Sequence, residues 1–262
     1  MPQKVDAKKS ELHVFAPDVH YPEVNKKALA ALLDFLQHNK LKTFIFGGDQ
    51  FSNNEISHWN KKRIIFKQPG LYKRNSDGFD RDVLTKVEER LEKTTNKIWI
   101  QGNHERFEQD LIDEQPELEG TIEHYKILNL VKRGWEIVEL GKGYKLGKLL
   151  VIHGENLTGI GNQAGAFPAK KAVESYAKSV LFGHIHTQQT YTKVLPHDES
   201  QKWAGYASPC IALPNPGYAR NKPNAVVNGF TIVETNGDLF NVYPVVITNG
   251  MFSFGGRVYG AK

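Results

Sequence analysis

The feature that most constrains this chain is a set of five short apolar runs, each of which ends at a turn residue. Each run is too short for a helix and is rich in β-branched or aromatic residues, which is typical of a buried strand. Segments with apolar side chains at helical spacing lie between the runs, and this alternation predicts an α/β fold. The runs cover residues 12–17, 43–47, 97–101, 149–153 and 179–183, and the helical patterns cover 25–39, 79–91 and 168–177.

The pattern changes after Gly183. Residues 189–194, 229–234 and 239–246 predict strands separated by turns, with no helical pattern between them, so we expect antiparallel sheet in the last third of the chain. No internal repeat or low-complexity linker divides the 262 residues. We therefore expect a single domain over residues 1–262, with the polar and charged segment 1–11 flexible.

Residue types that bind metal ions follow every one of the five runs. In order along the chain, these residues are Asp18, His20, Asp49, Asn103, His153, His184 and His186. Ligands of open α/β sheets bind beyond the carboxyl ends of the strands, so we expect all of these side chains at one rim. One such residue after a strand is usually a satisfied polar group or a turn residue. Five strands in register, most followed by glycine, instead indicate a site, because glycine lets backbone and metal approach closely.

The order of these motifs resembles that of the calcineurin-like metallophosphoesterase family. The motifs are Asp-x-His, Gly-Asp, Gly-Asn-His-Glu, His-Gly and Gly-His-x-His, and they extend from Asp18 to His186. The resemblance implies a four-layer αββα sandwich of two mixed sheets, with a di-metal site at the carboxyl-terminal ends of the strands. It also implies a hydrolase that acts on phosphate mono- or diesters.

The resemblance assigns a role to each of these side chains. Asp18, His20 and His186 would bind one metal ion, Asn103, His153 and His184 would bind the other, and Asp49 would bridge both. His104 would bind no metal. It would face the substrate and stabilise or protonate the leaving oxygen.

The types of donor atom bear on which metals bind. Imidazoles suit Mn, Fe, Zn, Ni or Co, and several imidazoles without a thiolate disfavour Ca and Mg. Two such divalent ions about 3.5–4 Å apart can activate a bridging hydroxide and neutralise charge on the phosphoryl group. No motif contains a cysteine nucleophile, which favours direct attack by hydroxide over a phospho-enzyme.

The second motif departs from the family pattern in two ways. Ser52 stands where family members often have Asp or Asn, which affects a supporting hydrogen bond but not the bridging Asp49. The Arg-Gly pair that follows this motif in protein Ser/Thr phosphatases is missing. Its absence counts against a phosphoprotein phosphatase.

Two alternatives differ from a small-ester phosphoesterase. A nuclease of the same fold is favoured by the net charge of +5 and by six basic residues, with no acidic one, in segment 61–74. The plainer interpretation of that segment is a solvated helix and turn. His58 and Trp59, which precede it, are expected to be a surface histidine and a core tryptophan. A non-catalytic scaffold, like the retromer subunit of this fold, is disfavoured because all seven ligand positions and His104 are present.

Composition limits the cellular context. The one cysteine, Cys210, allows no intrachain disulfide and no cysteine-based zinc site, and it fits a reducing compartment, so we expect a cytoplasmic protein. The N-terminal segment lacks the apolar core of a signal peptide, and no stretch approaches the ~18 apolar residues of a membrane span. The expected partners are a phosphate-ester substrate and, in the nuclease alternative, nucleic acid, but no membrane. The natural substrate, the native metals and the oligomeric state stay open.

Overall fold

The computed structural model describes residues 10–155, 167–214 and 226–260. Residues 1–9 of the segment expected to be flexible lie outside these ranges, and Glu11 already belongs to the first strand. No helix within the described ranges has the length and apolar character needed to cross a membrane.

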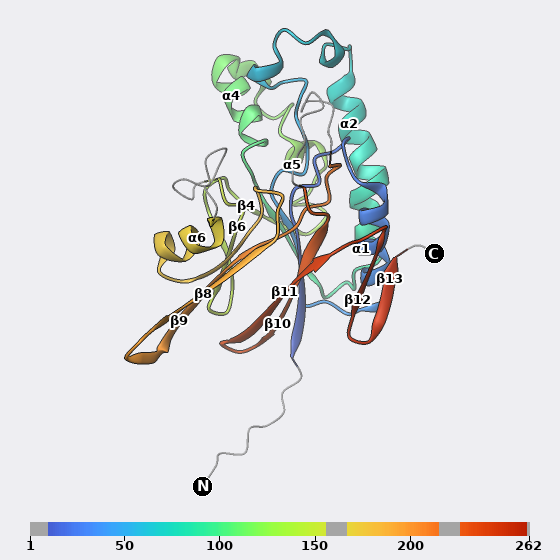
Figure 1. The fold of residues 1–262 in the computed structure, drawn as a ribbon. Coiled ribbons are helices and arrows are strands. Elements are labelled where there is room, and N and C mark those ends of the chain that lie inside the picture. Colours follow the sequence, from blue (N-terminus) through green and yellow to red (C-terminus); the bar gives the residue numbers. More distant parts are fainter. Residues whose placement is uncertain (1–9, 156–166, 215–225, 261–262) are drawn as a thin grey trace.

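The larger of two main sheets has six strands, in the order β11-β10-β1-β2-β3-β4 (Figure 1). Strands β1 to β4 are parallel, whereas β10 pairs antiparallel with both β1 and β11, so the sheet is mixed. Its strands are β1 (Glu11–Ala16), β2 (Thr43–Gly47), β3 (Asn96–Ile100), β4 (Trp135–Val138), β10 (Gly229–Asn236) and β11 (Leu239–Val246).

The second sheet has five strands, in the order β5-β6-β7-β9-β8, and is also mixed. Strands β6, β7 and β9 are parallel, and antiparallel strands form both edges. The strands are β5 (Tyr144–Leu146), β6 (Leu149–Ile152), β7 (Ser179–Phe182), β8 (Gln189–Leu195) and β9 (Asp198–Ala207). A separate hairpin of β12 (Met251–Phe254) and β13 (Arg257–Gly260) packs on helix α1 (Lys26–His38), where Tyr259 contacts Phe35.

Alternating side chains of the first sheet contribute to two different cores. In β2, Phe44 and Phe46 belong to the core beneath α1, whereas Ile45 belongs to the core between the sheets. Helix α6 (Pro168–Tyr176) covers the outer face of the second sheet through a third core (Figure 1). The layers are therefore helix, sheet, sheet and helix, and the prediction of an αββα sandwich with two mixed sheets is confirmed.

Two of the three predicted helices lie where the sequence places them. The side chain of Asn25 caps α1 by accepting hydrogen bonds from the N–H groups of Lys27 and Ala28, and α6 begins at a proline. The prediction for 79–91 begins too late, because the helix runs without a break from Leu71. Its first turns are polar and carry no apolar periodicity, and a π-helical stretch then shifts the spacing. This run comprises α2 (Leu71–Phe79), η3 (Asp80–Leu84) and α3 (Thr85–Glu88).

The other helices of the described residues are α4 (Arg106–Glu114), α5 (His124–Ile127) and the short η1 (His58–Asn60), η2 (Ile64–Phe66) and η4 (Pro116–Leu118).

The strands predicted after Gly183 are present as β8, β10 and β11, and their pairings with one another, with β9 and with β1 are antiparallel. Strand β9, which the sequence pattern does not predict, pairs in parallel with β7. The last third of the chain is therefore not wholly antiparallel.

His13 is a buried histidine that should make the stability of the fold depend on pH. Its Nε2 lies 2.9 Å from Oγ1 of Thr235, which joins β1 to β10. Burial is the main cause that lowers the pKa of His13 from 6.5 to about 4. Glu11 raises this pKa by a smaller amount, and Lys42 lowers it slightly. The unfolded chain therefore takes up this proton at a higher pH than the folded chain, and acidification favours unfolding.

We expect His13 to remove about 2–3 kcal/mol from the free energy of unfolding between pH 7 and pH 4.5. The measurement is urea unfolding at both pH values for the wild type and for His13→Gln. The glutamine variant should lose less stability on acidification than the wild type by that amount. An equal loss in both proteins would show that His13 is not the group responsible.

Candidate metal centre

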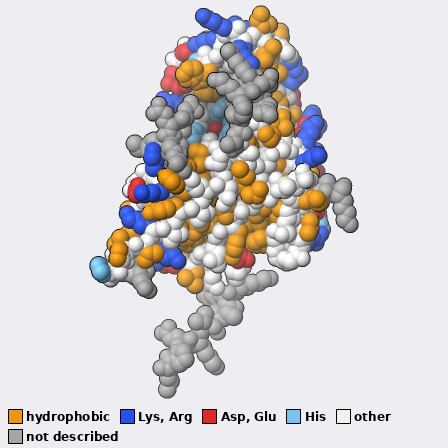
Figure 2. Space-filling view, in the orientation of Figure 1, with side chains coloured by type: hydrophobic (Ala, Val, Ile, Leu, Met, Phe, Trp, Pro, Cys, Tyr) orange, Lys and Arg blue, Asp and Glu red, His pale blue; other side chains and the backbone are white. Residues whose placement is uncertain are grey.

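The loops after five strands bring the predicted ligands together. Strands β1, β2 and β3 belong to the first sheet, and β6 and β7 belong to the second. The site therefore lies across the two sheets and is not confined to the rim of one. Histidine and carboxylate atoms lie on the floor of a hollow at this end of the molecule (Figure 2).

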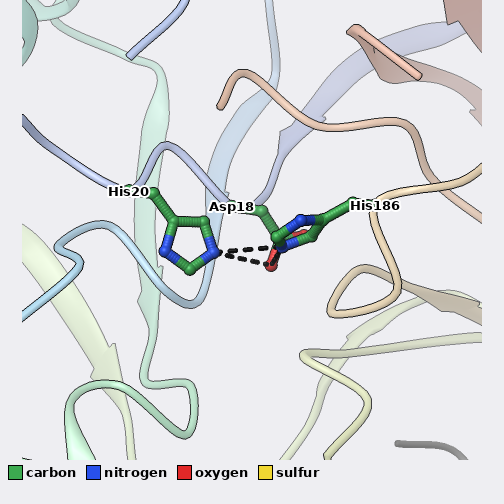
Figure 3. Close-up of side chains that lie close together, drawn as sticks. All are labelled: Asp18, His20 and His186. Atoms are coloured by element: carbon green, nitrogen blue, oxygen red, sulfur yellow. Dashed lines mark hydrogen bonds and ion pairs between the residues drawn. The ribbon is translucent and has the colours of Figure 1, made fainter. Parts of the chain in front are cut away.

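The first group of predicted ligands comprises Asp18, His20 and His186, which point toward one another (Figure 3). Nε2 of His186 lies 3.3 Å from Oδ1 of Asp18 and 3.0 Å from Nε2 of His20. The side chains come from the loops after β1 and β7, and one nitrogen or oxygen atom of each faces the same point. Three such donors at this spacing could hold a metal ion.

The second group comprises Asp49, His153 and His184. Nε2 of His153 lies 3.3 Å from Oδ2 of Asp49 and 3.1 Å from Oδ1 of Asn103, so the amide oxygen of Asn103 also reaches this group. Nδ1 of His153 donates to the carbonyl of Gly47 at 2.9 Å, which leaves the lone pair of Nε2 in a neutral ring free to bind a metal.

The donor set fits metal ions. Nδ1 of His184 is buried and makes no hydrogen bond within the described ranges, which is costly for a polar atom unless a metal binds it. Both groups combine carboxylate oxygen with imidazole nitrogen and contain no thiolate. Such a set suits the later first-row divalent ions.

Asp49 lies between the two groups. Its Oδ2 is 3.3 Å from Nε2 of His153 and 3.8 Å from Nε2 of His20, so one oxygen faces a histidine of each group. Its Oδ1 accepts a hydrogen bond of 2.8 Å from the backbone N–H of His104. This contact fixes the carboxylate and places His104 beside it.

His104 is held by its other ring nitrogen. Nδ1 donates to the carbonyl of Ser52 at 2.6 Å, so Nε2 faces the site, 3.9 Å from Oδ2 of Asp49. The amide of Asn53 also donates to the carbonyl of His104, at 2.9 Å. The sequence departs from the family pattern at Ser52, but hydrogen bonds to His104 are still supplied by the backbone carbonyl of Ser52 and by the side chain of Asn53. The hydroxyl of Ser52 donates instead to the carbonyl of His20 at 3.0 Å.

Five of the seven predicted ligands adopt the left-handed backbone region. This conformation costs a residue other than glycine on the order of 1 kcal/mol, and it is concentrated at functional sites because the surrounding structure maintains it. The residues and their φ angles are Asp18 at 54°, His20 at 51°, Asp49 at 54°, His184 at 68° and His186 at 56°.

Two glycines allow the loops to approach closely. A Cβ atom on Gly48, whose φ is +92°, would lie 2.4 Å from Nδ1 of His153, and one on Gly102 would lie 2.3 Å from Oδ1 of Asp49. Any side chain at either position would displace a predicted ligand. The glycines beside the ligands are therefore required by the geometry of the site.

Glu105 is a buried carboxylate to which the sequence analysis assigns no role. It accepts hydrogen bonds from the backbone N–H groups of Asp49 at 3.0 Å, Gln50 at 2.9 Å and Gly102 at 2.8 Å. Burial, and then repulsion from Asp49, raise its pKa to about 8. Glu105 joins the loops after β2 and β3, and its place at the end of the Gly-Asn-His-Glu motif is the signal that could have identified it.

Burial and neighbouring charges act in opposite directions on the pKa values of Asp49 and His153. Burial alone would raise the pKa of Asp49, but His153 and His104 hold it well below its usual value. Burial would lower the pKa of His153, yet the charge of Asp49 raises it well above 6.5. Burial and then His153 lower the pKa of His184 to about 4. A metal bound here would take the place of the proton that His153 holds.

Of the comparisons with known proteins, the match to a protein family bears on this site. A profile of the calcineurin-like phosphoesterase family matches residues 14–188. A search of the curated proteins gives no match. Similar solved structures include zinc-complexed Vps29 from Entamoeba histolytica, with 12% identity and a TM-score of 0.45, covering 95% of this chain and 98% of that one.

Vps29 from Cryptosporidium parvum has 10% identity and a TM-score of 0.47, covering 96% of this chain and 99% of that one. A predicted phosphoesterase from Streptococcus pneumoniae has 10% identity and a TM-score of 0.38, covering 97% and 100%. The family match includes every motif residue from Asp18 to His186, and the chain belongs to the calcineurin-like phosphoesterase family.

Proposed function

We propose that this protein hydrolyses phosphate mono- or diesters at a centre of two divalent metal ions. The observation that supports this most is the position of Asp49, with one carboxylate oxygen between two groups of His and Asp donors. Asp18, His20 and His186 would hold one ion, and Asn103, His153 and His184 the other. Mn, Fe, Zn, Ni and Co all suit these donors.

The ions, when bound, would supply Lewis acidity and a hydroxide nucleophile at neutral pH. The chain itself supplies His104. Its Nδ1–H bond to Ser52 fixes the ring, so a proton on Nε2 points into the site, where it can be given to the leaving oxygen. The side chain of His104 is 19% exposed, so a substrate entering the hollow can reach it.

A metal analysis combined with a chromogenic assay tests the proposal. Protein purified under reducing conditions without chelator should carry transition metal and should hydrolyse bis(4-nitrophenyl) phosphate. A chelator should abolish hydrolysis, and Mn²⁺ or another of the candidate ions should restore it. Protein that binds no transition metal under these conditions would refute the central claim.

The structure bears on both alternatives. A scaffold without catalysis has no need for His104, whose ring is held at the site by the carbonyl of Ser52 and whose backbone N–H donates to Asp49, so we disfavour it. The charge of segment 61–74 is partly neutralised, because Lys61 pairs with Glu114 and Lys73 pairs with Asp77. Basic charge alone is therefore weaker support for a nuclease than the sequence indicates. The cytoplasmic location, which rests on the single cysteine, stays a prediction.

A further inference from the structure

A row of four aromatic rings leads away from the proposed metal centre and ends in solvent. The ring centroid of Phe107 lies 5.1 Å from that of His104, and His58 lies 5.7 Å from Phe107. Trp59 follows, 4.4 Å from His58, and is 79% exposed. The row starts at the residue proposed to protonate the leaving oxygen, so a substrate held along it extends from the reacting phosphate.

The exposure of Trp59 contradicts the expectation that it lies in the core. Trp99 and Trp135 are buried, and a large aromatic side chain that stays in water commonly marks a binding surface. Trp59 lies in η1, in the segment that crosses the top of the molecule between α4 and α2 in Figure 1.

The basic side chains that follow Trp59 in the sequence, and Arg106 beside Phe107 on α4, differ in how far their charge is already paired. Lys62 and Lys67 are exposed and have no ion-pair partner among the residues that the structure describes. Lys61 pairs with Glu114, and Arg106 lies 3.5 Å from Asp110, so part of the local charge is neutralised by helix α4. Aromatic contacts should therefore contribute more to ligand binding here than the few unpaired positive charges do.

We propose that Trp59, the outer end of this row, is a stacking platform for single-stranded nucleic acid, with His58 and Phe107 packed between it and His104. This inference rests on the proposed function and names its substrate class: a phosphodiester within a single strand. A base adjoining the scissile phosphate stacks on the exposed ring of Trp59, because every base offers a π-face, while His58 packs against that ring at 4.4 Å and Lys62 and Lys67 contact the backbone. Bases paired within a duplex are not free to stack on the rings.

The balance of stacking and charge gives a salt dependence that can be measured. Each phosphate contact to a single strand contributes a slope of about −0.7 to the dependence of log affinity on log salt. Two available lysines should therefore give a slope of only about −1 to −2. Changing Lys62 and Lys67 together to Gln should flatten it further, whereas removing Trp59 should lower affinity at every salt concentration.

The test measures binding by fluorescence anisotropy, with metal-stripped protein and a fluorescein-labelled oligothymidylate, so that no cleavage interferes. Trp59→Ala should weaken binding about 5- to 100-fold, because one stacked base is lost, and Trp59→Phe should restore most of it. Tyr243→Ala is the matched control, since Tyr243 is 38% exposed but lies on β11, an edge strand of the larger sheet. It should bind as the wild type does.

Three outcomes separate the possibilities. Equal binding by Trp59→Ala and the wild type would overturn the platform, even if a small ester is hydrolysed normally. Trp59-dependent binding to phosphatidylserine vesicles, without binding to the strand, would assign this surface to lipid and would also overturn it. Trp59-dependent strand binding by a protein that hydrolyses no ester would support the platform and contradict the proposed function.

Discussion

Replacing Asp49 with asparagine should empty both proposed metal sites. Oδ2 of Asp49 faces His153 at 3.3 Å and His20 at 3.8 Å, so one carboxylate serves both groups. Asparagine keeps the shape but removes the charge and one oxygen. Outer-shell partners of metal ligands are typically worth about 10- to 100-fold in affinity, so loss of the shared ligand should weaken both sites by at least about 100-fold. Elemental analysis after dialysis measures this, and ester hydrolysis should fall with it.

Two further variants make the interpretation specific. His20→Ala should chiefly empty the site of Asp18 and His186 and leave the other occupied. Asp238→Asn is the matched control, because Asp238 is 69% exposed and pairs with Lys148 at the surface, so metal content should not change. Circular dichroism in chelator should show that all three variants are folded. Retention of metal at both sites by Asp49→Asn would refute the bridging role.

The central strands could be predicted because both of their faces are buried. In β1, Val14, Phe15 and Ala16 are all inaccessible to solvent, so the strand appears in the sequence as an unbroken apolar run. The run does not reveal that Phe15 faces the second sheet while its neighbours face the helices. The second sheet was expected from the family resemblance alone, since nothing local to β6 or β7 assigns them to it.

Elements fixed by distant contacts could not be predicted. Helix α2 begins at Leu71, and Tyr72 secures its first turn by donating to the carbonyl of Ile122, some 50 residues away. Gly78 lies against the ring of Tyr21, so burial of this helix depends on a loop that the sequence pattern does not connect to it. Strand β9 pairs with β7 although strand β8 lies between them in the sequence, and local composition does not encode that choice.

In the candidate site, too, the sequence predicted the residue types but not how distant parts of the chain bring them together. The ligand types were visible because each follows a strand, but their arrangement, with Asp49 close to both His153 and His20, depends on tertiary structure. Trp59 was expected in the core on the basis of side-chain type, yet its exposure is decided by what packs beside it. Phe107 lies three residues after His104, and no sequence pattern links it to His58, which reaches it from another loop.

Replacing His104 with asparagine should lower turnover about 10²- to 10⁴-fold, the range that loss of a general acid typically gives. Metal content should stay near that of the wild type, because His104 is not among the proposed ligands. The asparagine amide can still donate to the carbonyl of Ser52, so the loop should keep its shape. His38→Asn is the control, since His38 lies half-buried on α1, away from the strand ends.

The dependence on the leaving group distinguishes proton donation by His104 from a structural effect. An acidic leaving group such as 4-nitrophenolate departs without a proton. For an ester that carries it, the loss of turnover in His104→Asn should therefore be small. An alkyl ester needs the proton, and its hydrolysis should show the full loss. If His104 only shaped the pocket, both esters would lose the same factor. Release of metal from His104→Asn would instead show that His104 is a ligand, since its Nε2 lies 3.9 Å from Oδ2 of Asp49 and is grouped with Asp49 and His20.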